Sequence, residues 1–241
     1  MMNNAVPESK WREVWTRKGG EVDSHDLESL MKADGFDAGT GCISVADWLV
    51  SAEDIASRLR LRDSANVLEV GCGAGAMLWP LRKLGIRLYG VDYSDTLTAT
   101  AKAAIPELTA SSAEACSLPF EDGMFEAVFS HGVFFYFADL GYAQRAMDEI
   151  WRVLDKSCGR ALILDVPDQA KQERCEGFRR DVVYKGQDYP TGQDSPYRHL
   201  YFAKQWFEEY AARRGMKCTV YDQDLPSYPM SPFRFNALLE L

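Results

Sequence analysis

The stretch that decides the fold is Asn66-Val67-Leu68-Glu69-Val70-Gly71-Cys72-Gly73-Ala74-Gly75, a short apolar run that ends in three glycines at alternate positions. Such a run is typical of a buried strand, and the residues after it indicate a tight turn and the start of a helix. Glycine lets the turn adopt positive φ and lie close to a ligand, and the first helical turn offers backbone N–H groups without partners. The stretch therefore predicts a nucleotide-binding turn.

The glycine spacing alone does not identify the nucleotide. Gly71, Gly73 and Ala76 also match the G-x-G-x-x-G/A pattern of dinucleotide-binding proteins. Glu69, however, lies near the carboxyl end of the strand, where its carboxylate would repel a pyrophosphate and attract a cation. A cationic nucleotide is favoured, and a dinucleotide remains the alternative.

A second acidic residue, Asp92, ends the next strand-like run, 92 − 71 = 21 positions after Gly71. An acid about 20 residues beyond the first glycine is placed to hold ribose hydroxyls in this kind of fold. Together the E-x-G-x-G-x-G turn and Asp92 resemble the class I S-adenosylmethionine-dependent methyltransferases, in particular the small-molecule enzymes of the ubiquinone-biosynthesis type. The resemblance implies S-adenosyl-L-methionine as the cofactor, with its methionine half at the glycine turn and its ribose at Asp92.

Two further segments carry the same resemblance. Residues 113–120 are similar to the family's G-D-A-x-x-L-P-F element, and residues 149–154 are similar to its E-I-x-R-V-L element. The first implies that the Glu114 carboxylate accepts from the adenine amine and that the Ala115 N–H reaches a ring nitrogen, with Glu114 standing where the family usually has Asp. The cofactor contacts expected from the resemblance are Trp15, Glu69, Gly71, Cys72, Gly73, Gly75, Asp92, Tyr93, Glu114, Ala115 and Ser130.

Apolar periodicity divides the chain into alternating strands and helices. Strands are expected at 66–70, 87–91, 107–110, 125–130, 159–166, 217–221 and 233–239; helices are expected at 8–18, 44–59 with a restart near 51, 77–84, 94–104, 141–154 and 204–214, with loop at 21–43. The last two strands are joined only by a Pro-rich turn, so they must pair antiparallel. This order matches the fold that the resemblance implies: an α/β, Rossmann-like, doubly wound seven-stranded sheet with an antiparallel last strand and helices on both faces.

The length of 241 residues suffices for one large domain. We expect a single methyltransferase domain over 1–241, divided into N-terminal helices and a lid (1–62), a cofactor-binding core (63–166), a substrate-lid insertion (167–202) and a C-terminal helix with an antiparallel strand pair (203–241). The lids are inferred from the helix that carries Trp11 and Trp15 before a Gly-Gly break, and from the long tyrosine-rich connection after the fifth strand. Plain packing is the alternative role for the tryptophan helix.

Composition limits the expected partners and location. The net charge is −9 and no dense basic stripe is present, which argues against a nucleic-acid partner. No apolar run reaches membrane-spanning length, and the first residues lack a charged-then-apolar signal. The six cysteines include no C-x-x-C pair, which favours reduced thiols in a cytoplasmic protein over a disulfide framework or a metal site. We expect no membrane, nucleic-acid or metal partner; the oligomeric state stays open, with a homodimer as one option.

The resemblance implies methyl transfer to a small-molecule acceptor by direct displacement. The end of the fourth strand reads Ser130-His131-Gly132-Val133, not the N/D-P-P-Y/F element of enzymes that methylate amino groups of nucleic-acid bases. O- or N-methylation of a biosynthetic, secondary-metabolite or sugar-type substrate is the leading function. An NAD(P)-dependent oxidoreductase and a non-catalytic cofactor-binding scaffold are the alternatives.

Two histidines are candidates for a general base. His131 ends the fourth strand at the edge where ligands bind in open α/β sheets, and His199 lies in the expected substrate lid. A structural role is the alternative for each histidine. The expected acceptor contacts are Phe135, Tyr136, Tyr197 and Arg198.

Overall fold

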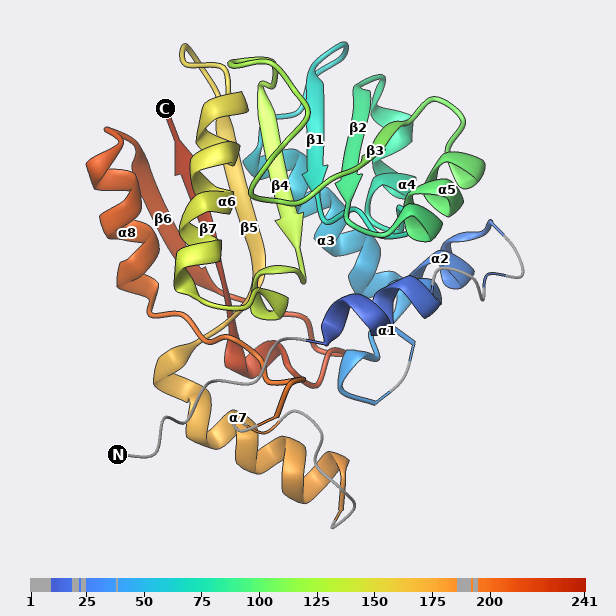
Figure 1. Ribbon diagram of the computed structural model, residues 1–241, viewed down its shortest axis with the longest axis vertical. Helices are drawn as coiled ribbons and strands as arrows, with labels where there is room; N and C mark the ends of the chain where they lie inside the picture. Colours follow the sequence, from blue (N-terminus) through green and yellow to red (C-terminus); the bar gives the residue numbers. More distant parts are fainter. Residues whose placement is uncertain (1–9, 19–21, 23–24, 38, 186–191, 193–194) are drawn as a thin grey trace.

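One seven-stranded sheet forms the centre of the molecule (Figure 1), in a computed structural model that describes residues 10–18, 22, 25–37, 39–185, 192 and 195–241. The strand order is β3-β2-β1-β4-β5-β7-β6, and β7 alone runs antiparallel to its two neighbours. The strands are β1 (Asn66–Val70), β2 (Arg87–Asp92), β3 (Thr109–Ser112), β4 (Ala127–His131), β5 (Arg160–Pro167), β6 (Lys217–Asp222) and β7 (Arg234–Glu240). The predicted sheet and its reversed last strand are thus confirmed.

Helices cover both faces of the sheet, because successive side chains of each strand point to opposite sides. Val67 of β1 packs in one apolar cluster, and Leu68 and Val70 pack in the other. The first cluster includes α3 (Val45–Arg58), α4 (Leu78–Leu81) and α5 (Asp95–Ala104), and the second includes α6 (Leu140–Val153) and α8 (Lys204–Arg213). The doubly wound arrangement is therefore also confirmed.

Side-chain caps set the starts of the main helices. The hydroxyl of Ser44 accepts from the backbone N–H of Asp47 at the start of α3, and the Ser94 hydroxyl does the same for Leu97 in α5. Each cap satisfies a backbone donor that has no partner within the helix. A short 3₁₀ segment, η2 (Arg82–Leu84), follows α4 and ends at Gly85, which has the left-handed φ of 68°.

Several elements differ from the sequence-based expectation, among them β4, which begins two residues later than expected. Residues 27–33, expected as loop, form helix α2 (Leu27–Ala33), and η1 (Gly39–Gly41) follows it. Asp26 caps α2, whose apolar face is fully packed, so tertiary burial outweighs the glycine-rich surroundings. Helix α3 is continuous at Ser51, whose hydroxyl donates to the Asp47 carbonyl instead of capping a new helix. Strand β3 begins two residues later than expected.

The connection after β5 begins with helix, as expected for roughly residues 169–180. It holds η4 (Gln169–Lys171), α7 (Gln172–Phe178) and a π-helical turn, η5 (Arg179–Val183). The expected lid residues 186–191, 193 and 194 lie outside the described residues. In Figure 1, α7 and α1 (Trp11–Lys18) both lie beyond the carboxyl ends of the parallel strands.

The remaining short segments are η3 (Phe134–Tyr136), directly after β4, and η6 (Ser231–Phe233), directly before β7. Both therefore lie at the end of the sheet where the parallel strands finish. None of the helices in the described part of the chain has the length and apolar character that crossing a membrane requires.

Candidate active site

A cavity of about 270 Å³ lies at the carboxyl ends of the parallel strands. Its walls come from α1, the segment after α2, the glycine turn, the ends of β2 and β4, and the first residue of β7. The cavity brings together thirteen of the sequence-predicted site residues, namely Trp15, Glu69, Gly71, Cys72, Gly73, Asp92, Tyr93, Glu114, Ala115, His131, Phe135, Tyr136 and His199.

Two predicted cofactor residues lie behind the wall of the cavity. A Cβ on Gly75 would lie 3.3 Å from the Ala101 Cβ, so this glycine permits close packing of the turn on α5. Ser130 is fully buried, and its hydroxyl donates to the Val70 carbonyl at 2.7 Å. Both residues shape the glycine turn from behind.

Two predicted acceptor residues contact α1 instead of lining the cavity. The Tyr197 ring meets the Trp11 ring edge-on, with centroids 5.6 Å apart. The carbonyl of Arg198 accepts from the Trp11 indole N–H at 3.3 Å, and its guanidinium donates to the Ala138 carbonyl. The segment around residue 198 therefore supports the tryptophan helix.

The first two glycines of the turn are required by close approach. Gly71 and Gly73 have φ values of 78° and 52°, a region that side chains disfavour. A Cβ on Gly71 would lie 2.3 Å from the Val133 side chain, and a Cβ on Gly73 would lie 2.1 Å from the carboxylate of Asp34.

Asp34 is a site residue that the sequence did not reveal. Its carboxylate accepts from the backbone N–H groups of Ala74 at 2.7 Å and Ala76 at 3.2 Å. Burial raises the pKa of Asp34 to about 7, against the lowering effect of these two hydrogen bonds. No motif marks this residue, because it ends a helix in a segment that reads as loop.

Asp92 ties the end of β2 to the glycine turn. Its carboxylate accepts from the Gly73 N–H at 3.1 Å and from the Ser94 N–H at 2.9 Å. Burial raises the pKa of Asp92 to about 6, while its two hydrogen bonds and the charge of Arg12 lower it.

Glu69 completes a cluster of three carboxylates around the turn. It is 3% exposed, and within the described residues its Oε2 atom has no hydrogen-bond partner. Burial, followed by the charges of Asp34 and Asp92, raises the pKa of Glu69 well above its ordinary value. A buried acceptor without a donor is costly, and neighbouring negative charges add to that cost. The cluster therefore fits a ligand that brings a positive charge and hydrogen-bond donors.

Glu114 links the tryptophan helix to the opposite wall of the cavity. Its carboxylate forms an ion pair with Arg12 of α1 and accepts from the Tyr142 hydroxyl at 2.7 Å. The adenine contact assigned to Glu114 and Ala115 stays a prediction. Because the ion pair joins Glu114 to α1, a ligand that contacts this carboxylate would also affect the position of α1.

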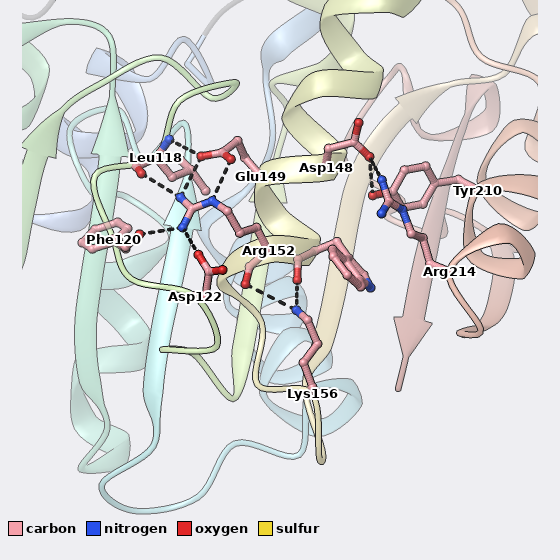
Figure 2. Close-up of polar contacts among 10 residues, drawn as sticks. Leu118, Phe120, Asp122, Asp148, Glu149, Arg152, Lys156, Tyr210 and Arg214 are labelled. Carbon is pink, nitrogen blue, oxygen red and sulfur yellow. Dashed lines mark hydrogen bonds and ion pairs between the residues drawn. The ribbon is translucent and has the colours of Figure 1, made fainter.

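The loop that carries Glu114 is anchored by Arg152 of α6 (Figure 2). The Arg152 guanidinium donates to the carbonyls of Leu118 and Phe120 at 3.0 and 2.8 Å, and it pairs with Asp122 and Glu149. Glu149 in turn accepts from the Leu118 N–H at 2.8 Å. These contacts give the E-I-x-R-V-L element a structural role, since its acid and its arginine hold the loop beside the cavity.

The two predicted bases are both buried. His131 is the last residue of β4, and its ring lies 5.4 Å from that of Phe36 and 5.1 Å from that of Trp48. Burial lowers the pKa of His131 to about 4. The Nδ1 of His199 lies 2.5 Å from the Arg179 guanidinium, and burial with two nearby guanidiniums lowers its pKa well below the ordinary value. Both rings are thus neutral near pH 7, and their role as base stays a prediction.

Aromatic side chains from α1 and from the segment after β4 line a further part of the cavity. The Tyr136 ring lies 4.6 Å from that of Trp11 and 5.3 Å from that of Trp15, and Phe135 stacks obliquely on Tyr136 at 4.2 Å. Trp11 and Trp15 come from α1, so this helix covers the cavity. The site therefore has an acidic half at the glycine turn and an aromatic half beneath α1.

Comparisons with known proteins identify a methyltransferase domain in this chain. Residues 68–162 match a family model described as a methyltransferase domain. The demethylmenaquinone methyltransferase of Streptomyces avermitilis is 24% identical over 152 residues, which span 62% of this chain and 64% of that protein, less than two thirds of its length.

Solved structures share the fold across almost the whole chain. A chain of the complex between the Haloferax volcanii Trm112 methyltransferase activator and a methyltransferase aligns with a TM-score of 0.66 at 16% identity, covering 93% of this chain and 96% of that one. The magnesium protoporphyrin IX methyltransferase of Synechocystis PCC 6803, solved with bound SAH, aligns with a TM-score of 0.58 at 13% identity, covering 97% and 94%. At such identities these likenesses concern the fold.

Proposed function

Since the chain carries a class I methyltransferase domain whose cofactor is S-adenosylmethionine, we propose that it transfers a methyl group from this cofactor to a small organic acceptor. The observation that carries the proposal is the carboxylate cluster of Glu69, Asp34 and Asp92 at the glycine turn, in a cavity that aromatic side chains also line. The bound cofactor supplies an electrophilic methyl group on a positively charged sulfur. The residues of this chain bind it, align the acceptor and exclude water.

Each of three acidic residues is assigned to a different part of the cofactor. Glu69, with its unpaired Oε2, is assigned to the cationic methionine half, and Asp92 to the ribose hydroxyls. Glu114 and the Ala115 N–H are assigned to adenine. A pyrophosphate at this turn would lie against three carboxylates, which argues against the NAD(P)-dependent oxidoreductase.

The aromatic half is assigned to the acceptor. Phe135 and Tyr136 follow the end of β4, and Trp11 and Trp15 close over them. This wall suits a small apolar or aromatic body better than a sugar, and methylation at oxygen or nitrogen remains the leading chemistry. His131 is the first candidate for taking a proton from such an acceptor, because it lines the cavity at the end of β4.

Helix α1 is the proposed lid. Three polar contacts join this helix to the core. They are the ion pair between Arg12 and Glu114, the hydrogen bond from the Trp11 indole to the Arg198 carbonyl, and the hydrogen bond from the Thr96 hydroxyl to the Thr16 carbonyl. These contacts are mostly exposed or half-buried, so opening α1 costs little compared with opening the sheet. The segment 167–202 is proposed to complete the cover through His199.

Calorimetry with S-adenosylhomocysteine, NAD⁺ and NADP⁺ tests the cofactor assignment. We expect S-adenosylhomocysteine to bind and the dinucleotides not to bind. Glu69→Gln should weaken binding by about tenfold, the scale for losing a charged hydrogen-bond partner. Glu126→Gln is the matched control, because that glutamate accepts from Asn66 at the opposite end of β1. Tight dinucleotide binding without S-adenosylhomocysteine binding contradicts the proposal, and cofactor binding without methyl transfer to any acceptor favours the scaffold alternative.

A further inference from the structure

A buried arginine lines the acceptor half of the cavity. Arg234 is the first residue of β7, is 2% exposed and belongs to the cavity wall. Among the described residues, neither its Nη1 nor its Nε atom has a hydrogen-bond acceptor. Donors of a buried guanidinium are costly to leave unused, so this side chain can bind a partner that the described residues do not supply.

Among the described residues, Asp165 is the carboxylate that pairs with Arg234, and its oxygens accept hydrogen bonds from other side chains. Asp165 lies 3.3 Å from the Arg234 Nε as an ion pair without hydrogen-bond geometry. Its two oxygens accept from the Tyr228 hydroxyl at 3.0 Å and from the Gln223 amide at 3.4 Å. Asp165 sits at a bulge in β5 with φ of 58°, held by the Asn236 side chain. It is therefore fixed, and it balances the charge of Arg234 without using its donors.

A second guanidinium, that of Arg179, lies close to His199 at this end of the cavity. Arg179 contacts His199, and both Arg179 and Arg234 lower the pKa of that histidine. The Arg234 guanidinium also lies 4.9 Å from the centre of the Phe135 ring. Among the described residues, the guanidiniums of Arg234 and Arg179 both lie near His199, whereas three carboxyl groups lie at the glycine turn.

We infer that the methyl acceptor carries a carboxylate, that Arg234 binds this carboxylate, and that the apolar or aromatic body of the acceptor lies against Phe135 and Tyr136. The inference rests on the proposed function and names its substrate class. The carboxyl groups at the glycine turn favour the cationic cofactor there, and the Arg234 guanidinium favours the anionic acceptor at the start of β7. The planar guanidinium matches a carboxylate with two parallel hydrogen bonds.

The test uses the full chain saturated with S-adenosylhomocysteine and a panel of matched acids and primary amides: benzoate, 4-hydroxybenzoate and cinnamate with benzamide, 4-hydroxybenzamide and cinnamamide. Binding is measured by calorimetry. At least one acid should bind about tenfold or more tightly than its amide, since the amide lacks the charge that Arg234 requires. An equal affinity for acids and amides, or no binding by any acid, overturns the inference.

Variants separate binding from a structural role. Arg234→Met should bring acid affinity down to that of the amide, while S-adenosylhomocysteine affinity changes less than threefold. Arg234→Lys keeps the buried charge and should keep part of the acid preference. It therefore tests whether this side chain binds the acceptor carboxylate even where the methionine variant does not fold. Arg160→Met is the matched control, because that arginine pairs with Glu240 at the opposite end of β5 and β7.

The outcomes are distinguishable from failure of the proposed function. Loss of S-adenosylhomocysteine binding in the unmodified chain contradicts the methyltransferase proposal itself. Intact S-adenosylhomocysteine binding with an undiminished acid preference in both Arg234 variants contradicts only the role of Arg234 in choosing the acceptor. A lower melting temperature in Arg234→Met with an unchanged acid preference identifies a purely structural arginine.

Discussion

The Oδ1 atom of Asp34 lies 2.7 Å from the backbone nitrogen of Ala74, so a carboxylate from the end of α2 closes the glycine turn from outside. Its other oxygen accepts from Ala76. The same carboxylate approaches Glu69 and Asp92 closely enough to raise the pKa of Glu69. A residue 40 positions before Ala74 thus adds to the effect of burial on the pKa of Glu69.

Asp34 should make stability depend on pH. Its pKa is about 7 in the folded protein and near 3.8 in the unfolded chain, so between these values only the folded state holds the proton. The free energy of unfolding that the protonated Asp34 contributes is therefore fully present below pH 3.8, and it is lost as pH rises through 7. The Asp34→Asn variant cannot titrate at this position. Its free energy of unfolding, relative to that of the wild type, should therefore rise by about 1 kcal/mol or more between pH 5 and pH 8. Urea unfolding at the two pH values measures the gain, and Asp37→Asn, an exposed neighbour, should show none.

Asp92 should contribute directly to cofactor affinity. Asp92→Ala removes a carboxylate assigned to the ribose hydroxyls and should weaken S-adenosylhomocysteine binding by about 1.5–3 kcal/mol. The exposed Asp95, three residues further on, provides the control variant Asp95→Ala. Calorimetry measures both. Unchanged affinity in Asp92→Ala would place the nucleotide elsewhere.

His131 should affect turnover more than cofactor binding. His131→Ala should lower the rate by about 10²-fold if this ring takes a proton from the acceptor. Because burial holds the pKa of His131 near 4, the ring stays neutral above that value, and the wild-type rate should show no His131 transition between pH 6 and 8. His199→Ala is compared in the same assay, with melting temperatures as a check on folding. Rates within a few-fold of wild type for both variants would mean that neither histidine is the base.

Helix α1 should become more protected when the cofactor site fills. Its side chains line the cavity and pair with Glu114, so S-adenosylhomocysteine gives the closed position additional contacts. Hydrogen exchange over residues 11–18 should slow with the ligand, while α8, which packs away from the cavity, should not change. Equal exchange of α1 with and without ligand would leave plain packing as its role.

Arg152 should stabilise the loop that carries Glu114. Arg152→Met leaves the Leu118 and Phe120 carbonyls without this donor and should cost about 1–3 kcal/mol of unfolding free energy. Arg214→Met is the control in Figure 2, since Arg214 pairs with Asp148 across two helices, far from the loop. Chemical denaturation of both variants measures the difference, and equal losses would contradict a special role for Arg152.

The sheet was predictable because its strands depend on local patterns. Residues 66–70 and 159–166 are apolar runs bounded by turn residues, and such runs fold as buried strands wherever the chain allows a parallel sheet. The glycine turn and Asp92 follow from the same logic, since the ends of adjacent parallel strands meet at one edge. The cofactor half of the cavity was thus largely visible in the sequence.

The rest of the site depends on distant contacts. Asp34 lies in no motif, and its place at the turn follows only from the packing of α2 against the core. Arg234 reaches the cavity because β7 pairs with β5 in one register, which periodicity alone does not fix. Arg198 and Tyr197 were assigned from polarity and position, yet they contact α1 behind the cavity wall.

The position of β7 also constrains the order in which the sheet assembles. This strand follows β6 in the chain but lies between β5 and β6, so β6 has no partner in the sheet until β7 has inserted. The edge of β5 stays open until then, and the pairing that closes it spans more than 60 residues, which makes it a slow step. Arg234 begins that strand, so its guanidinium reaches the cavity only through the same long-range pairing that completes the sheet.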